Sequence, residues 1–169
     1  DDIIQLLENS NVKYNAVEGR DRGIILREIS KRRYNIIIYF GHSEFNNNPE
    51  KTGWVCSGGE LFPCSDLNAI RHVPPDLIIS NSCHSARSIP FMSQSIANSA
   101  IENGARSFIG TRWFLESGRS AVFLQELIRG LISGGIDADP ENSFRCGVNA
   151  LKRKYGEDDI SLYNYIFFH

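Results

Sequence analysis

The amino-acid sequence predicts a mixed α/β fold with a mostly parallel central sheet. Short runs rich in β-branched residues alternate with longer segments of helical periodicity, which is the order typical of βαβ units. Two of the runs, 35–40 and 76–80, are short, continuous and apolar, as expected for strands that are buried on both faces. The 169 residues, 41% of them hydrophobic, suit one packed domain.

The expected elements follow one another along the chain without an internal repeat. The strands are 13–17, 35–40, the hairpin 53–61, 76–80, 106–110 and 163–168. The helices are 1–8, 21–33, a short one up to residue 71 capped by Ser65-Asp66, 88–103 with Gly104 as its stop, 118–133, and a last one from Asp139-Pro140 to 155. Residues 43–53 are polar and irregular. Two helices show a clear apolar face, made of Ile89, Met92, Ile96 and Ala100 in one and Leu124, Leu127, Ile128 and Leu131 in the other.

Composition excludes several classes of protein. The net charge is −2, without a basic tract, so no direct contact with nucleic acid is expected. No apolar run reaches the roughly 18 residues of a membrane span, and no signal peptide opens the chain. The four cysteines are expected to be free thiols in a reducing, cytoplasmic compartment; they are Cys56, Cys64, Cys83 and Cys146.

Chemistry-bearing residues gather where the predicted central strands end. Gly41-His42 follows the first strand, Ser82-Cys83-His84 the second and Thr111-Arg112-Trp113 the third. Active residues of open α/β sheets lie just beyond the carboxyl ends of strands. These three junctions are therefore the candidate site.

His42 and Cys83 have the residue types of a cysteine peptidase. Such an enzyme needs a thiolate, an imidazole that accepts and returns a proton, and backbone donors for the oxyanion. If the two strands are neighbours, about 4.8 Å apart, both side chains project into one crevice. The amides of Cys83 and Ser43 are the expected oxyanion donors. The structural alternative stays open here, because a single strand-end cysteine is usually a small buried hydrophobe.

Other polar residues rank below this pair. His84 directly follows Cys83 and is expected to be a loop residue whose side chain points away from the site, and Asn81 is expected to close a turn. Cys56 and Cys64 with His72 lack the paired spacing of a zinc site, so neither a metal nor a cofactor is expected. Three acids are expected to be solvated or, alternatively, to enter a substrate pocket: Glu44, Asp137 and Asp139.

Several motifs in order resemble the CHAT family of caspase-like cysteine peptidases, which are relatives of caspases, separase and gingipains. The motifs are the run Tyr39-Phe40-Gly41-His42, the hairpin, residues 75–83, residues 97–109 followed by Trp113, and residues 163–169. The resemblance covers residues 35–169. It implies a caspase-like three-layer α/β/α sandwich, and it implies His42 as base and Cys83 as nucleophile.

The resemblance also implies how the domain is used. Residues 1–169 are expected to be a single domain, cut from a longer protein and lacking its first strand, because residues 1–8 already resemble the first helix. The expected activity is cleavage of itself or of a dedicated protein partner, regulated by attached or partner modules. Two features depart from the family: Ser43 stands where a glycine is usual, and Glu116 follows Trp113 by three residues where an aspartate usually follows by four.

Trp113 and Glu116 are the expected residues of the pocket for the P1 side chain, with a place in the core as the alternative for Trp113. An apolar wall and a negative floor suit Lys or Arg. If Arg112 turned inward instead, an acidic P1 residue would be favoured; residues 112 and 113 alternate on an extended segment, so only one of the two faces the cleft. An uncharged P1 residue chosen by shape is the third outcome.

Two functions of other classes are alternatives to the peptidase. The first is a non-catalytic caspase-like interaction scaffold, with Ser43 marking the loss of activity. The second is a flavodoxin-like ligand-binding domain. That domain needs a phosphate loop after its first strand, and Ser57-Gly58-Gly59 neither follows a buried strand nor opens a long helix.

Overall fold

A four-stranded sheet organises the larger of the two units into which the chain divides. The computed structural model describes residues 2–19, 21–31, 34–46, 48–87, 95–135 and 138–169. The sheet unit consists of Val17–Leu115 and Tyr165–His169, and the helical unit of Asp1–Ala16 and Glu116–Asn164. Each unit has its own packing.

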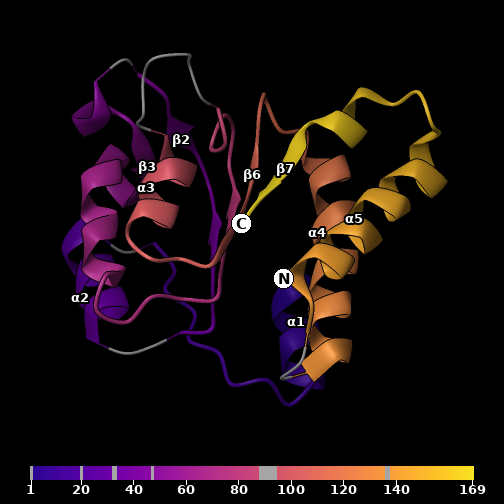
Figure 1. Cartoon of the computed structure of the whole chain (residues 1–169), viewed down its shortest axis with the longest axis horizontal. Coiled ribbons are helices and arrows are strands. Elements are labelled where there is room, and N and C mark those ends of the chain that lie inside the picture. Colours follow the sequence, from indigo (N-terminus) through magenta and orange to yellow (C-terminus); the bar gives the residue numbers. More distant parts are fainter. Residues whose placement is uncertain (1, 20, 32–33, 47, 88–94, 136–137) are drawn as a thin grey trace. The chain divides into compact units, whose positions relative to one another are not determined.

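The central sheet has the order β1-β5-β6-β7 (Figure 1). Its strands are β1 (Ile36–Phe40), β5 (Leu77–Asn81), β6 (Ser107–Thr111) and β7 (Tyr165–Phe168). β1, β5 and β6 run parallel, whereas β7 is antiparallel to β6. The mostly parallel sheet expected from the sequence is therefore confirmed. β6 is buried along its whole length. β5 is buried along all but its last residue, as the apolar run 76–80 predicted.

Helices and a small second sheet complete the sheet unit. α2 (Arg22–Lys31) and α3 (Ile96–Glu102) lie on the same side of the central sheet (Figure 1), and both contact the 3₁₀ helix η3 (Cys64–Ile70). The second sheet is antiparallel, with strands β2 (Ser43–Glu44), β3 (Gly53–Val55) and β4 (Leu61–Pro63). The predicted hairpin is confirmed as β3 and β4. Two further 3₁₀ turns lie beside these strands, η1 (Pro49–Lys51) and η2 (Ser57–Gly59).

The core of the sheet unit lies between these helices and the sheet. It is built from large apolar side chains that are almost inaccessible to solvent, among them Phe62, Leu67, Ile70, Ile78, Ala97, Ala100 and Phe108. α3 is followed by its C-cap Asn103 and then by Gly104, whose φ of +98° is a backbone conformation that favours glycine. The predicted helix stop is therefore confirmed.

The helical unit is built on two long helices, α4 (Ser117–Gly134) and α5 (Pro140–Tyr155), which pack along each other. α1 (Asp2–Asn9) contacts α4, and the 3₁₀ helix η5 (Ile160–Tyr163) contacts α5. The predicted apolar face of α4 is buried. Asp139 caps α5 by accepting a hydrogen bond from the amide of Glu141 at 2.9 Å, so the expected start of this helix is confirmed.

Four local expectations differ from the structure or fall outside it. Residues 13–17 are not a strand, because no described strand pairs with them. β1 is an edge strand rather than a buried one, and Phe40 is 48% exposed. Ser65-Asp66 does not cap η3, whose N-cap is Pro63; Asp66 instead accepts from Arg22 Nη2 at 2.8 Å. Residues 88–94 of the expected helix lie outside the described residues, and α3 begins after Ser95.

The described part of the chain contains no helix that is long and apolar enough to cross a membrane.

Candidate active site

His42 and Cys83 lie at the same edge of the central sheet. Phe40, the last residue of β1, is in register with Asn81, the last residue of β5. His42 and Cys83 each follow two residues later, at the carboxyl ends of neighbouring parallel strands. The two loops are joined directly, because Ser43 Oγ donates a hydrogen bond to the carbonyl oxygen of Cys83. The adjacency on which the predicted pair depended is therefore present in the fold.

The backbone at His42 is held from both sides. Its carbonyl oxygen accepts a hydrogen bond from the amide of Val55 at 2.9 Å, and the hydroxyl of Tyr39 lies 2.6 Å from the same oxygen. The Tyr39 ring stacks on Trp54 with centroids 4.7 Å apart. Burial raises the pKa of Tyr39 to about 12, so this hydroxyl keeps its proton over the whole physiological range. The His42 side chain itself is exposed.

A tight turn carries Cys83. His84, the next residue, has φ +57°, a left-handed conformation that is uncommon for a residue with a side chain and that occurs often at functional sites. The amide of His84 donates to the carbonyl of Trp113 at 3.2 Å, and the amide of Ala86 donates to that of Thr111 at 2.9 Å. The turn after β5 is thus bonded to the end of β6.

Two buried hydroxyls fix this turn further. Ser85 Oγ donates to the carbonyl of Ser80 at 2.9 Å and accepts from the amide of Thr111 at 3.0 Å. Thr111 Oγ1 donates to the carbonyl of Ser82 at 2.6 Å. Gly110 leaves the space that this arrangement needs, because a Cβ on Gly110 would lie 2.8 Å from Ser85 Oγ. The backbone that carries Cys83 is therefore held by β5 and β6 together.

The sulfur of Cys83 has a backbone donor. The amide of Leu115 lies 3.3 Å from Cys83 Sγ in hydrogen-bonding geometry. The side chain is half-buried, so it is reachable from solvent while its backbone is enclosed. Sequence reasoning missed Leu115, since a backbone amide leaves no signal in the residue type.

The amides of Ser43 and Cys83, the expected oxyanion donors, form no backbone hydrogen bond among the described residues. Ser43 pairs with Trp54, and the amide of Val55 donates to the carbonyl of His42. In that pattern Ser43 and Trp54 are a non-hydrogen-bonded pair, so the Ser43 amide is not used by the ladder. The amide of Cys83 has no acceptor among the described residues. Both amides therefore remain available to a substrate oxygen.

His84 is a structural loop residue, as predicted, although for a different reason. Its Nδ1 lies 3.0 Å from the carbonyl oxygen of Arg112, and its ring meets Phe114 edge-on at 4.7 Å. The side chain was expected to point away because an extended backbone was assumed, but the backbone is not extended here, since φ is positive. The ring is directed at the segment after β6 by the turn itself.

The residues expected in the P1 pocket belong to different units. Trp113 is in the sheet unit and is 43% exposed. Glu116 is in the helical unit, where it precedes α4 and its carboxylate accepts from Arg119 Nη1. Arg112 is exposed. The pocket itself stays a prediction, and the charge of Glu116 is already paired with a guanidinium.

The remaining candidates have structural roles or no observed one. Cys56 and Cys64 are buried, which raises the pKa of Cys56 and raises that of Cys64 to about 11. The described residues contain no group of three or more His, Cys, Asp or Glu that could hold a metal. Asn81 Oδ1 accepts from the Tyr165 hydroxyl at 3.2 Å. Glu44 is exposed on β2, and Asp137 lies outside the described residues.

Comparison with known proteins gives a family and a fold. The family model of the CHAT domain matches residues 4–144. Among solved structures, the chain resembles the Arg-specific cysteine proteinase gingipain R with a TM-score of 0.63 and 17% sequence identity. The match covers 92% of this chain but only 37% of gingipain R. No curated protein matches the sequence. The similarity supports the caspase-like fold, and the chain belongs to the CHAT-domain family.

Proposed function

We propose that this domain is a cysteine endopeptidase with Cys83 as nucleophile and His42 as general base. The observation that carries the proposal is the register of β1 and β5, which brings both residues two positions beyond paired strand ends, in loops joined by the Ser43–Cys83 hydrogen bond. Membership of a caspase-like family supports it. Neighbouring parallel strands are about 4.8 Å apart, so an imidazole and a thiol at their ends are within reach of one substrate carbonyl.

The chemistry follows from these groups. His42 takes the proton of the Cys83 thiol, and the thiolate sulfur attacks the carbonyl carbon of the scissile bond. The resulting oxyanion is bound by the amides of Cys83 and Ser43. His42 then gives its proton to the leaving amine, so the C–N bond breaks and a thioester remains on Cys83. Water, deprotonated by His42, hydrolyses the thioester and restores the free thiol.

The proposed substrate is the protein itself or a dedicated partner, with activity controlled by attached or partner modules. For the P1 residue we propose a basic side chain on the Trp113 side of the site. The structural relative gingipain R is described as Arg-specific, which agrees with this choice. The pairing of Glu116 with Arg119 makes an uncharged P1 residue the alternative.

Thiol labelling tests the proposal and discriminates it from an inactive scaffold. Cys146 is exposed whereas Cys83 is half-buried, so accessibility alone predicts that iodoacetamide labels Cys146 first. An activated thiol predicts the opposite order, with Cys83 fastest at neutral pH. Labelling of Cys83 no faster than Cys146 would support the non-catalytic scaffold.

Cleavage assays complete the test. Cys83→Ala and His42→Ala should each lower cleavage by about a thousandfold or more, because the pair acts as a unit and the two losses do not add. Cys146→Ser, in the helical unit, should leave cleavage unchanged. Strong residual proteolysis in Cys83→Ala would refute the assignment.

A further inference from the structure

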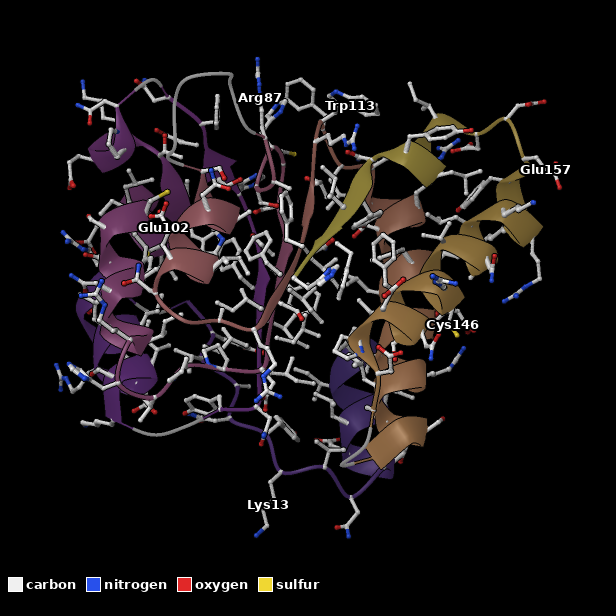
Figure 2. All side chains as sticks on the ribbon, viewed as in Figure 1. Lys13, Arg87, Glu102, Trp113, Cys146 and Glu157 are labelled. Carbon is white, nitrogen blue, oxygen red and sulfur yellow. The ribbon has the colours of Figure 1, made fainter. Side chains whose placement is uncertain are left out.

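A second contact between the two catalytic loops involves Arg87. Arg87 follows Cys83 by four residues, and its amide donates to the carbonyl of His84 at 3.0 Å, which closes the turn. Its guanidinium carbon lies 5.0 Å from the centroid of the Phe45 ring. Phe45 follows His42 by three residues. Arg87 and Trp113 both lie at the end of the sheet unit where the site is found (Figure 2).

The guanidinium of Arg87 is oriented but has no acidic partner in the described structure. Arg22 and Arg119 pair with carboxylates, whereas no described carboxylate forms an ion pair with Arg87. The side chain is exposed. A guanidinium stacked on an aromatic ring keeps its N–H edge available for bidentate binding of a carboxylate. Arg87 is therefore held in an orientation in which its guanidinium can bind a carboxylate.

The sheet order places this group on one side of the nucleophile. β1 and β6 flank β5 on opposite sides. Phe45 continues from the β1 side and Trp113 from the β6 side, so the stack on Phe45 directs the guanidinium of Arg87 towards the β1 side. His42 is on that side too, and in the proposed reaction it protonates the leaving amine. The residues that follow the scissile bond must therefore lie near His42.

We propose that Arg87 is a specificity-determining residue that binds an Asp or Glu side chain in the three residues following the scissile bond. The inference rests on the proposed peptidase function and adds to it a substrate position at which an acidic residue is preferred. Three residues of an extended peptide span about 10 Å, so the position that meets the guanidinium is sought among the first three after the scissile bond. Phe45 is the positioning residue for this interaction.

Aza-peptide epoxides that extend past the reactive centre provide the test, because Cys83 captures them covalently. The probes have Arg, Ala or Leu at P1 and carry Asp or Asn at one of the three following positions at a time. Labelling of the full chain is measured by intact mass. At one of these positions the Asp probe should react about tenfold faster than its Asn partner, as expected for a charge-assisted bidentate contact. Arg87→Gln should remove the difference, and Phe45→Leu should reduce it.

Controls separate this inference from the function on which it rests. Arg106→Gln removes another exposed arginine, one that precedes β6 and pairs with Asp76, and should keep the preference for Asp. Arg87→Glu should instead favour a Lys probe. Suppose that iodoacetamide labels Cys83 selectively, but the Asp and Asn probes react equally or both fail to react. The inference about Arg87 is then wrong and the peptidase proposal stands. If neither reagent labels Cys83 ahead of Cys146, both are wrong.

Discussion

Replacing the buried Ser85 by alanine should destabilise the sheet unit and slow thiol chemistry at Cys83. The hydroxyl is inaccessible to solvent, accepts from the amide of Thr111 at 3.0 Å and donates to the carbonyl of Ser80 at 2.9 Å. Its removal leaves the Thr111 amide buried without this acceptor, which costs about 1–3 kcal/mol, and removes a second bond worth about 1 kcal/mol. The free energy of unfolding should therefore fall by about 2–4 kcal/mol.

Urea unfolding followed by circular dichroism measures this loss, and the rate at which iodoacetamide alkylates Cys83 measures the effect on the turn. Ser143→Ala is the matched control. Its hydroxyl donates to the carbonyl of Asp139 at 3.0 Å, and the Ser143 amide donates to the same carbonyl, so the acceptor keeps a partner and the cost should stay below about 1 kcal/mol. Equal losses in both variants, with unchanged alkylation of Cys83, would show that Ser85 does not hold the turn.

Three further predictions concern the base, the nucleophile's support and the helical unit. Tyr39→Phe removes the hydroxyl 2.6 Å from the His42 carbonyl and should lower kcat about fivefold, the equivalent of about 1 kcal/mol, without slowing alkylation of Cys83. A parallel drop in both rates would contradict a role specific to His42. Gly110→Ala places a Cβ 2.6 Å from the Phe108 ring and 2.8 Å from Ser85 Oγ and should lower the free energy of urea unfolding by about 1–3 kcal/mol. Gly23→Ala in α2 should not destabilise the fold, and equal stability of the two variants would refute the close approach at Gly110. The pKa of Asp159 is lowered first by its hydrogen bond from Arg119 and then by Ser161, so its carboxylate stabilises the folded unit above the unfolded pKa of about 3.9 and progressively less as the pH falls below that value. The difference in the urea midpoint of unfolding between the wild type and Asp159→Asn should therefore shrink below about pH 4. A difference that does not depend on pH would argue against the ion pair.

Strands and helices with a complete local pattern could be predicted from the sequence. β5 is a short apolar run, α4 has a regular apolar face, and α5 has a clear start at Asp139-Pro140, so local preference and tertiary structure agree. The strand expected at residues 13–17 was wrong because alternation alone does not supply a partner strand. The burial of β1 was misjudged for a related reason, since an apolar run of six residues does not reveal whether both of its edges are covered.

In the candidate site, only the side chains whose residue type itself suggests catalysis could be predicted from the sequence. His42 and Cys83 follow apolar strands and have the residue types that catalysis needs, and both lie where they were expected. Ser85 was missed, and Thr111 was named only as part of a junction without a role, because a serine or threonine hydroxyl has the same sequence signature in a solvated loop as in a buried turn. The positive φ of His84 was missed because most residues in this conformation are glycine or asparagine. Such roles depend on which backbone groups the fold leaves without partners.

The hydrogen bond to the nucleophile's sulfur has a mechanical consequence. Leu115, its donor, ends the segment Val17–Leu115 of the sheet unit, and Glu116 begins the segment Glu116–Asn164 of the helical unit. A single residue, Glu116, thus separates the donor from α4, which begins at Ser117, has 18 residues and is about 27 Å long. A rigid helix of that length acts as a lever, and hydrogen bonds weaken steeply when their angle falls towards 120°. A small rotation imposed at the far end of α4 would therefore reach the Cys83 sulfur through the main chain itself.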